Sequence, residues 1–144
     1  MYTYERNKNR RVKMAGLNGL FQSADWKTEK HVPVIEMSDA VKKGELASIT
    51  VTVGKEIPHP NKAEHHISWI AVYFQPDGDK YPYQIGKTEF IAHGESVKGA
   101  DTSTIYTHPK VTLNFKAEVP GTIYAASYCN IHGLWESSKK ISIA

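Results

Sequence analysis

Cysteine is almost absent from this sequence, in which Cys129 is the single cysteine among 144 residues. One cysteine cannot form an internal disulfide, which excludes the cystine-stapled folds of small secreted proteins. A lone thiol suits a reducing compartment, or a metal or catalytic role. A chain of this length can bury an ordinary apolar core, so it needs no such staples.

Long apolar runs and a strong excess of one charge are also missing. No stretch approaches the roughly 18 apolar residues needed to span a bilayer, and residues 15–21 are too short and too glycine-rich for a signal peptide. The net charge is only +3, and its densest basic run, between Arg6 and Lys13, is interpreted as a solvated tail. We therefore expect a cytoplasmic protein that binds neither membrane nor nucleic acid.

Most of the remaining sequence predicts strands separated by turns rich in glycine, proline, asparagine and aspartate. The best helix candidate, residues 37–43, is short. Several short strands with such spacing predict one all-β domain, an immunoglobulin-like β-sandwich. The expected strands are residues 46–53, 67–74, 111–117 and 122–129, with shorter candidates at 89–92, 104–106 and 140–143.

Two histidines lie in one segment, HPNKAEHH (59–66), just before the expected strand at 67–74. Pro58 and Pro60 restrict the backbone around His59, which would orient this side chain before any ligand binds. His65 and His66 are neighbours, and successive side chains of an extended chain point to opposite faces. Only one of this pair can therefore face a shared metal ion.

The expected strand at 122–129 ends in Cys129, and His132 follows three residues later. This spacing lets a thiolate and an imidazole reach one metal from a single turn, for which Gly133 supplies backbone freedom. Backbone N–H groups of such a turn can also point at the sulfur. His31, in EKHVP (29–33), offers a further imidazole.

These residues alone leave three classes of protein open. Imidazole and thiolate together suit zinc, copper or iron, and do not suit calcium or magnesium. A structural zinc site usually carries more cysteine. A copper electron-transfer protein of the cupredoxin type needs a weak axial methionine, and Met1, Met14 and Met37 all precede the turn. An immunoglobulin-like binding module with incidental histidines is the third alternative, and the metal content would separate all three.

Four segments of the sequence resemble the iron-binding domain of the superoxide reductase family, the neelaredoxins and desulfoferrodoxins. The resemblance runs from about Phe21 to the end of the chain, and implies an N-terminal extension at 1–20 and the iron-binding domain at 21–144. It implies one-electron reduction of superoxide to hydrogen peroxide, a defence against oxidative stress. The four segments are EKHVP (29–33), HPNKAEHH (59–66), AHGES (92–96) and SYCNIHGLWE (127–136).

The resemblance also implies a ligand set, residue by residue. Larger relatives carry a second centre held by four cysteines, whereas a chain with one cysteine is expected to bind a single iron ion. Three further histidines, His66, His93 and His108, match no ligand. The implied ligands are four equatorial histidines, His31, His59, His65 and His132, with Cys129 as the axial thiolate.

Two charged neighbours of His31 match catalytic positions of the family. Glu29 matches a carboxylate that occupies the open iron position in the oxidised state, and Lys30 matches a lysine close to that position. The resemblance further implies a small rubredoxin-like protein as electron donor and a homotetrameric assembly. No other cofactor is implied.

Overall fold

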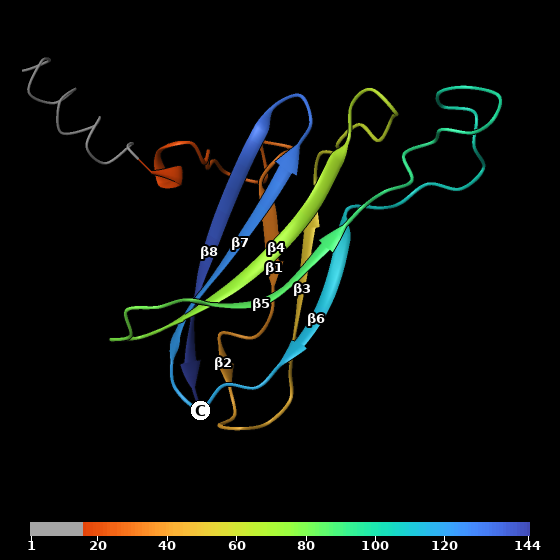
Figure 1. Ribbon diagram of the computed structural model, residues 1–144. Coiled ribbons are helices and arrows are strands. Elements are labelled where there is room, and N and C mark those ends of the chain that lie inside the picture. Colours follow the sequence, from red (N-terminus) through yellow and green to blue (C-terminus); the bar gives the residue numbers. More distant parts are fainter. Residues whose placement is uncertain (1–15) are drawn as a thin grey trace, which may run out of the picture.

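The computed structural model describes residues 16–144 and consists of two β-sheets packed face to face (Figure 1). It confirms the predicted all-β, immunoglobulin-like β-sandwich. Apart from a single 3-10 turn, η1 (Leu17–Gly19), every element among these residues is a strand. The strands are β1 (Pro33–Glu36), β2 (Ala40–Val41), β3 (Ala47–Val53), β4 (Ile67–Pro76), β5 (Tyr83–Glu89), β6 (Lys110–Phe115), β7 (Gly121–Cys129) and β8 (Gly133–Ile143).

The smaller sheet has the order β1-β3-β6 and the larger sheet the order β2-β8-β7-β4-β5. All neighbours pair antiparallel except β2 and β8. The pairing of β7 with β8 extends to Cys129 opposite Gly133, so a tight turn joins these two strands.

The core lies between the two sheets and follows from alternating burial along the strands. In β3, Ile49 and Val51 are fully buried, and in β7 Ile123 and Cys129 are fully buried. Cys129 therefore belongs to the same apolar cluster as the branched side chains of both sheets. Core packing therefore fixes the position of its sulfur without a bound ligand.

The helix predicted at residues 37–43 is wrong. Within this window Ala40–Val41 forms β2, which pairs parallel with Ser142 and Ile143 at the end of β8. Seven residues are too few for a stable isolated helix, and the strand pairing satisfies the backbone instead. The short strands expected at 89–92 and 104–106 are also not formed as such, because this connection contains only isolated bridges such as His93 with Tyr106.

The connections gather at the two ends of the sandwich. Figure 1 places the β7–β8 turn, the β3–β4 connection and the start of β1 at one end, and the C-terminus at the other. Within residues 16–144, no helix has the length and apolar character that a membrane crossing requires.

Candidate metal centre

All five predicted metal ligands come from loops or strand ends at one end of the sandwich (Figure 1). His31 lies two residues before β1, His59 and His65 lie in the β3–β4 connection, Cys129 ends β7, and His132 directly precedes β8. Segments separated by up to about a hundred residues in the sequence therefore meet here, because antiparallel pairing returns strand starts and ends to the same edge.

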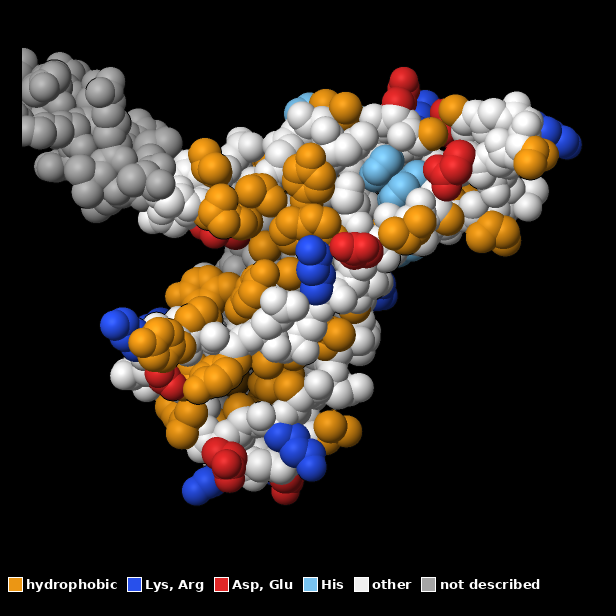
Figure 2. All heavy atoms as spheres, in the orientation of Figure 1, with side chains coloured by type: hydrophobic (Ala, Val, Ile, Leu, Met, Phe, Trp, Pro, Cys, Tyr) orange, Lys and Arg blue, Asp and Glu red, His pale blue; other side chains and the backbone are white. Residues whose placement is uncertain are grey.

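Four of these side chains direct their donor atoms toward one point. His31 Nε2 lies 3.1 Å from His132 Nδ1, which lies 3.2 Å from His65 Nε2 and 3.8 Å from Cys129 Sγ. All four donor atoms lie within 4.8 Å of one another. Cys129 is fully buried and His132 is exposed, so the sulfur lies on the protein side of the cluster. Figure 2 shows histidine side chains reaching the surface at this end.

The His59 ring closes the arrangement. Its centroid lies 4.8 Å from that of His31 and 4.8 Å from that of His65, and His132 lies 4.7 and 5.0 Å from the same two rings. The four imidazoles thus form a closed ring of neighbours. His59 Nδ1 donates to the Pro60 carbonyl at 2.7 Å, which leaves Nε2 as an acceptor that is buried and has no hydrogen-bond partner among the described residues.

These distances fit a single transition-metal ion. Metal–imidazole bonds are about 2.1 Å long, so neighbouring nitrogens at right angles around one ion lie about 3.0 Å apart. The two N···N distances observed here, 3.1 and 3.2 Å, match this spacing. A bound cation would also satisfy His59 Nε2, which otherwise carries the cost of a buried unpaired polar atom.

The turn between β7 and β8 holds the Cys129 sulfur and the His132 imidazole together, as its spacing predicts. Gly133 has a φ of +82°, a left-handed conformation that glycine adopts without strain. The backbone N–H of His132 donates to Cys129 Sγ at 3.3 Å. A hydrogen bond of this kind stabilises the thiolate and tunes the potential of a metal bound to it.

Burial favours the neutral form of His31, His59 and His65, which is the form that binds a metal. It lowers the pKa of His59 to about 4. Burial also lowers the pKa of His65, and positive charge on His132 or His31, when either is protonated, and on Lys30 lowers it further. A neutral imidazole presents a lone pair at neutral pH, which metal binding requires.

Glu29 contacts His31 on the side of the ring away from the cluster. Its Oε1 accepts a hydrogen bond from His31 Nδ1 at 2.6 Å and another from the His31 backbone N–H. Burial acts to raise the pKa of Glu29, but these hydrogen bonds outweigh it and the pKa falls below its usual value. A carboxylate in this position fixes the tautomer that directs His31 Nε2 toward a metal.

Lys30 lies close enough to act electrostatically on three of the imidazoles. Burial is the largest cause of the lowered pKa values of His31, His59 and His65, and the positive charge of Lys30 lowers these values further. Lys30 is half-buried. The structure thus brings both predicted catalytic residues, Glu29 and Lys30, to the edge of the histidine ring.

Several residues that support the centre were not predicted from the sequence. Trp135 stacks on His31 with centroids 4.9 Å apart and donates from Nε1 to the His132 carbonyl. Gln22 Nε2 donates to the same carbonyl, and the buried Ser127 hydroxyl donates to the His31 carbonyl. Ser127 and Trp135 both lie within the segment of family resemblance at 127–136, and this proximity to Cys129 and His132 is the one signal that points to them.

The other histidines lie outside the cluster, as the resemblance implies. His66 and His93 stack on each other with centroids 3.5 Å apart, and His93 is buried. The nitrogens of His93 contact Asn61 Oδ1 and the Phe90 carbonyl oxygen. His108 is exposed.

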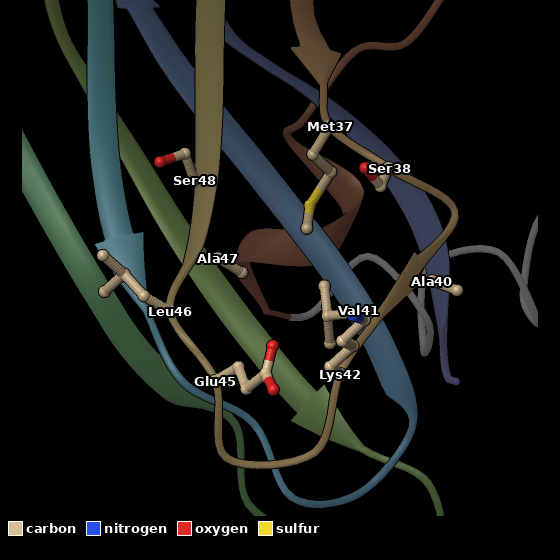
Figure 3. Close-up of a pocket in the computed structure, with 9 residues that line it drawn as sticks. All are labelled: Met37, Ser38, Ala40, Val41, Lys42, Glu45, Leu46, Ala47 and Ser48. Atoms are coloured by element: carbon tan, nitrogen blue, oxygen red, sulfur yellow. The ribbon is translucent and has the colours of Figure 1, made fainter.

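Among residues 16–144, Met37 is the only methionine, and it lies far from the cluster. It lines a pocket beside β2 at the opposite end of the sandwich, together with Val41 and Ala47 (Figure 3). No described methionine is therefore placed to act as the axial ligand that a cupredoxin copper site requires.

The fold and these side chains together define a β-sandwich protein with a centre built from imidazole and thiolate donors. The chain belongs to the desulfoferrodoxin family, whose model matches residues 23–138. Neelaredoxin from Megalodesulfovibrio gigas is 55% identical over 124 residues, which are 86% of this chain and 95% of that protein. Superoxide reductase from Pyrococcus furiosus is 56% identical over 116 residues, 81% of this chain and 91% of that protein.

Solved structures show the same fold. The structure of superoxide reductase (neelaredoxin) from Archaeoglobus fulgidus in the reduced form superimposes with a TM-score of 0.81 at 56% sequence identity. The match covers 86% of this chain and 99% of that one. The sandwich described above is therefore shared across nearly the full length of that structure.

Proposed function

We propose that this chain is a superoxide reductase that binds one iron ion through His31, His59, His65, His132 and Cys129. The convergence of four imidazoles and one thiolate at the end of the sandwich is the observation that carries the proposal. The buried His59 Nε2, which has no hydrogen-bond partner among residues 16–144, supports it further, because a bound cation in this position would satisfy that atom. Among transition metals that accept mixed nitrogen and sulfur ligands, the family relationship favours iron.

The overall reaction combines superoxide, one electron and two protons into hydrogen peroxide. Iron, when bound, supplies that electron. Cys129 would donate electron density from the buried side, and the His132 N–H holds its sulfur in the required orientation. Divalent iron held by imidazoles and one thiolate would leave a net positive charge at the site, which attracts an anionic substrate.

Lys30 and Glu29 are the proposed catalytic residues. Lys30 adds a positive charge at the edge of the ring and would attract superoxide and donate a hydrogen bond to it. Glu29 holds His31 through Nδ1 in this structure. Its additional role as the carboxylate at the open position of the oxidised centre stays a prediction.

The expected partners and boundaries follow the same reasoning. We propose a small rubredoxin-like electron donor, a cytoplasmic location, and a domain formed by residues 21–144 preceded by an extension at 1–20. Gln22 supports the boundary, because it bridges to Trp135 of β8 and is the first described residue to join a sheet. We also propose a homotetramer, supported by exposed aromatic side chains such as Tyr124 on the outer face of the larger sheet.

The decisive experiment measures the metal content and the product yield together. Protein loaded without oxygen should contain one iron per chain, and with a reducing donor it should form one peroxide for each superoxide consumed. The Cys129→Ser variant should lose the visible thiolate-to-ferric absorption and the activity. Stoichiometric zinc or copper, or one peroxide for every two superoxides as in dismutation, would contradict the proposal.

A further inference from the structure

Asn130 occupies the turn between two predicted ligands, Cys129 and His132, but its side chain points to a different segment. Its Nδ2 donates to the Glu64 carbonyl at 2.9 Å. Its Oδ1 accepts from the His66 backbone N–H, also at 2.9 Å. Since one partner is a carbonyl and the other an N–H, these contacts fix which end of the amide carries oxygen.

The two partners of this amide lie on either side of His65. A third hydrogen bond, from the Asn130 backbone N–H to the His66 carbonyl at 3.2 Å, completes the contact between the two segments. His65 itself is held in a tight turn, in which His65 and Lys62 exchange backbone hydrogen bonds of 2.9 and 3.1 Å. The backbone of His65 is thus fixed relative to the turn that carries the thiolate.

We propose that Asn130 is a positioning residue that holds His65 in register with Cys129 and His132. The inference rests on the proposed iron centre. His65 and His132 come from segments 67 residues apart, yet their donor nitrogens lie 3.2 Å from each other. Among residues 16–144, Asn130 is the one residue of the turn whose side chain bonds to the backbone on both sides of a predicted ligand in the other segment.

The loss of this amide should loosen His65 while leaving the other donors in place. Partners that orient a metal ligand typically change metal affinity about 10–100-fold when they are removed. Asn130→Ala should therefore speed the loss of iron to a ferrous chelator by about this factor, and shift or broaden the thiolate-to-ferric absorption. Asn130→Asp keeps the acceptor for the His66 N–H but sets a carboxylate oxygen against the Glu64 carbonyl, so it should also lose iron faster than the wild type.

Asn114→Ala provides the matched control. Asn114 lies on β6, and its Oδ1 accepts from the Ser48 hydroxyl at 2.6 Å, so this variant also removes an exposed asparagine with a hydrogen bond between segments distant in sequence. It should retain the wild-type rate of iron loss and the wild-type spectrum. Equal rates and spectra for Asn130→Ala and the wild type would overturn the inference.

A double-mutant cycle separates positioning from simple support of the fold. If Asn130 acts through His65, then Asn130→Ala should add no further iron loss to His65→Ala. An additive effect of the two changes would show that the amide only stabilises the turn. Wild-type protein that binds no iron would instead refute the proposed function, and this outcome is distinct from unchanged behaviour of the Asn130 variants in an iron-loaded protein.

Discussion

At the scale of single residues, the metal centre depends on which ring nitrogens of its histidines form hydrogen bonds to the rest of the protein. His59 Nε2 has no hydrogen-bond partner among the residues that the structure describes, whereas Nδ1 of the same ring is bonded to the Pro60 carbonyl. His31 shows the same division, with Glu29 at Nδ1 and the cluster at Nε2. In both rings one nitrogen is fixed by the protein so that the other is free to bind a metal.

Glu29→Ala should weaken iron binding because it removes the acceptor at His31 Nδ1. We expect a loss of affinity of about 10–100-fold, as for other carboxylates that orient a ligand histidine. Glu29→Gln keeps an oxygen at this position and should show a smaller loss. Competition with a ferrous chelator measures both variants, and unchanged affinity in Glu29→Ala would show that this contact does not hold the ring.

Lys30→Ala should slow the capture of superoxide without changing the iron content. The lysine charge attracts the anion over several ångströms, and salt screens this attraction. The second-order rate constant should therefore fall, and its dependence on ionic strength should become weaker. Pulse radiolysis at several salt concentrations measures both quantities. Lys110→Ala, on the exposed face of β6, is the control and should behave as the wild type.

The lowered pKa of His59 predicts how the iron-free protein responds to acid. The pKa is about 4 in the fold against 6.5 for an unperturbed histidine, so the unfolded chain binds the proton more readily between these values. His59 should therefore not reduce the free energy of unfolding above about pH 6.5, and this free energy should decline as the pH falls toward about 4. Urea unfolding across this range measures the decline. It should be shallower in His59→Gln, and parallel curves for the two proteins would refute this assignment.

At the scale of elements, strand ends determine where the ligands meet. Gly54, directly after β3, has a φ of +81°, and a Cβ built on it would lie 2.6 Å from the His59 backbone nitrogen. The chain turns sharply after β3 and passes close to itself before His59. This close approach, which only glycine permits, sets the path of the segment that carries two of the ligands.

Gly54→Ala should therefore displace the His59 segment as well as strain the backbone. The left-handed conformation alone costs about 1–2 kcal/mol for a residue with a Cβ. Gly78→Ala is the matched control, because Gly78 has a φ of +76° but no atom near its added Cβ. Unfolding and iron retention should both be more impaired in Gly54→Ala. Equal effects of the two variants would show that the contact with His59 has no consequence.

The sequence predicts those elements whose burial alternates regularly. The strands β3 and β7 could be predicted because apolar residues such as Ile49 and Ile123 lie on a buried face of each strand. The edge strand β5 was not predicted because its sequence, YQIGKTE, is mostly polar and partly exposed. Only the last part of β8 was predicted, since Glu136 to Lys140 is also polar. Pairing with a neighbouring strand forms these elements, and this pairing leaves no pattern in the local sequence.

The residues of the site likewise divide into those that the sequence predicts and those that it does not. The histidines and Cys129 were predicted because they lie in short motifs that resemble the family. Asn130 and Gln22 were not, because each acts through a hydrogen bond to the backbone of a segment far away in sequence. Backbone partners impose no residue type on the other segment, so no spacing or composition reveals such contacts in a single sequence.

At the scale of the whole molecule, the larger sheet presents an outer face with exposed aromatic side chains. Phe21, Tyr73 and Tyr124 line a shallow hollow on this face, and Tyr124 is 42% exposed. Figure 2 shows hydrophobic side chains clustered over one side of the molecule. Exposed apolar surface of this kind is typical of an interface between subunits.

Tyr124→Glu should therefore disrupt the proposed homotetramer. A charge buried in an apolar interface loses its hydration without gaining a partner, so smaller species should replace the tetramer. Thr112→Glu places the same charge on the exposed side of β6 and serves as the control. Light scattering coupled to size exclusion measures the mass. An unchanged mass in Tyr124→Glu would place the interface elsewhere.

The burial of Cys129 has a consequence for an enzyme that makes hydrogen peroxide. Peroxide oxidises exposed thiolates to sulfenic and higher acids, and the higher products are irreversible. Cys129 is fully buried and packs in the same cluster as Ile67 and Ile123, beneath the histidine ring. The packing that fixes the only sulfur donor thus also shields it from the product, which is a condition for the centre to survive many turnovers.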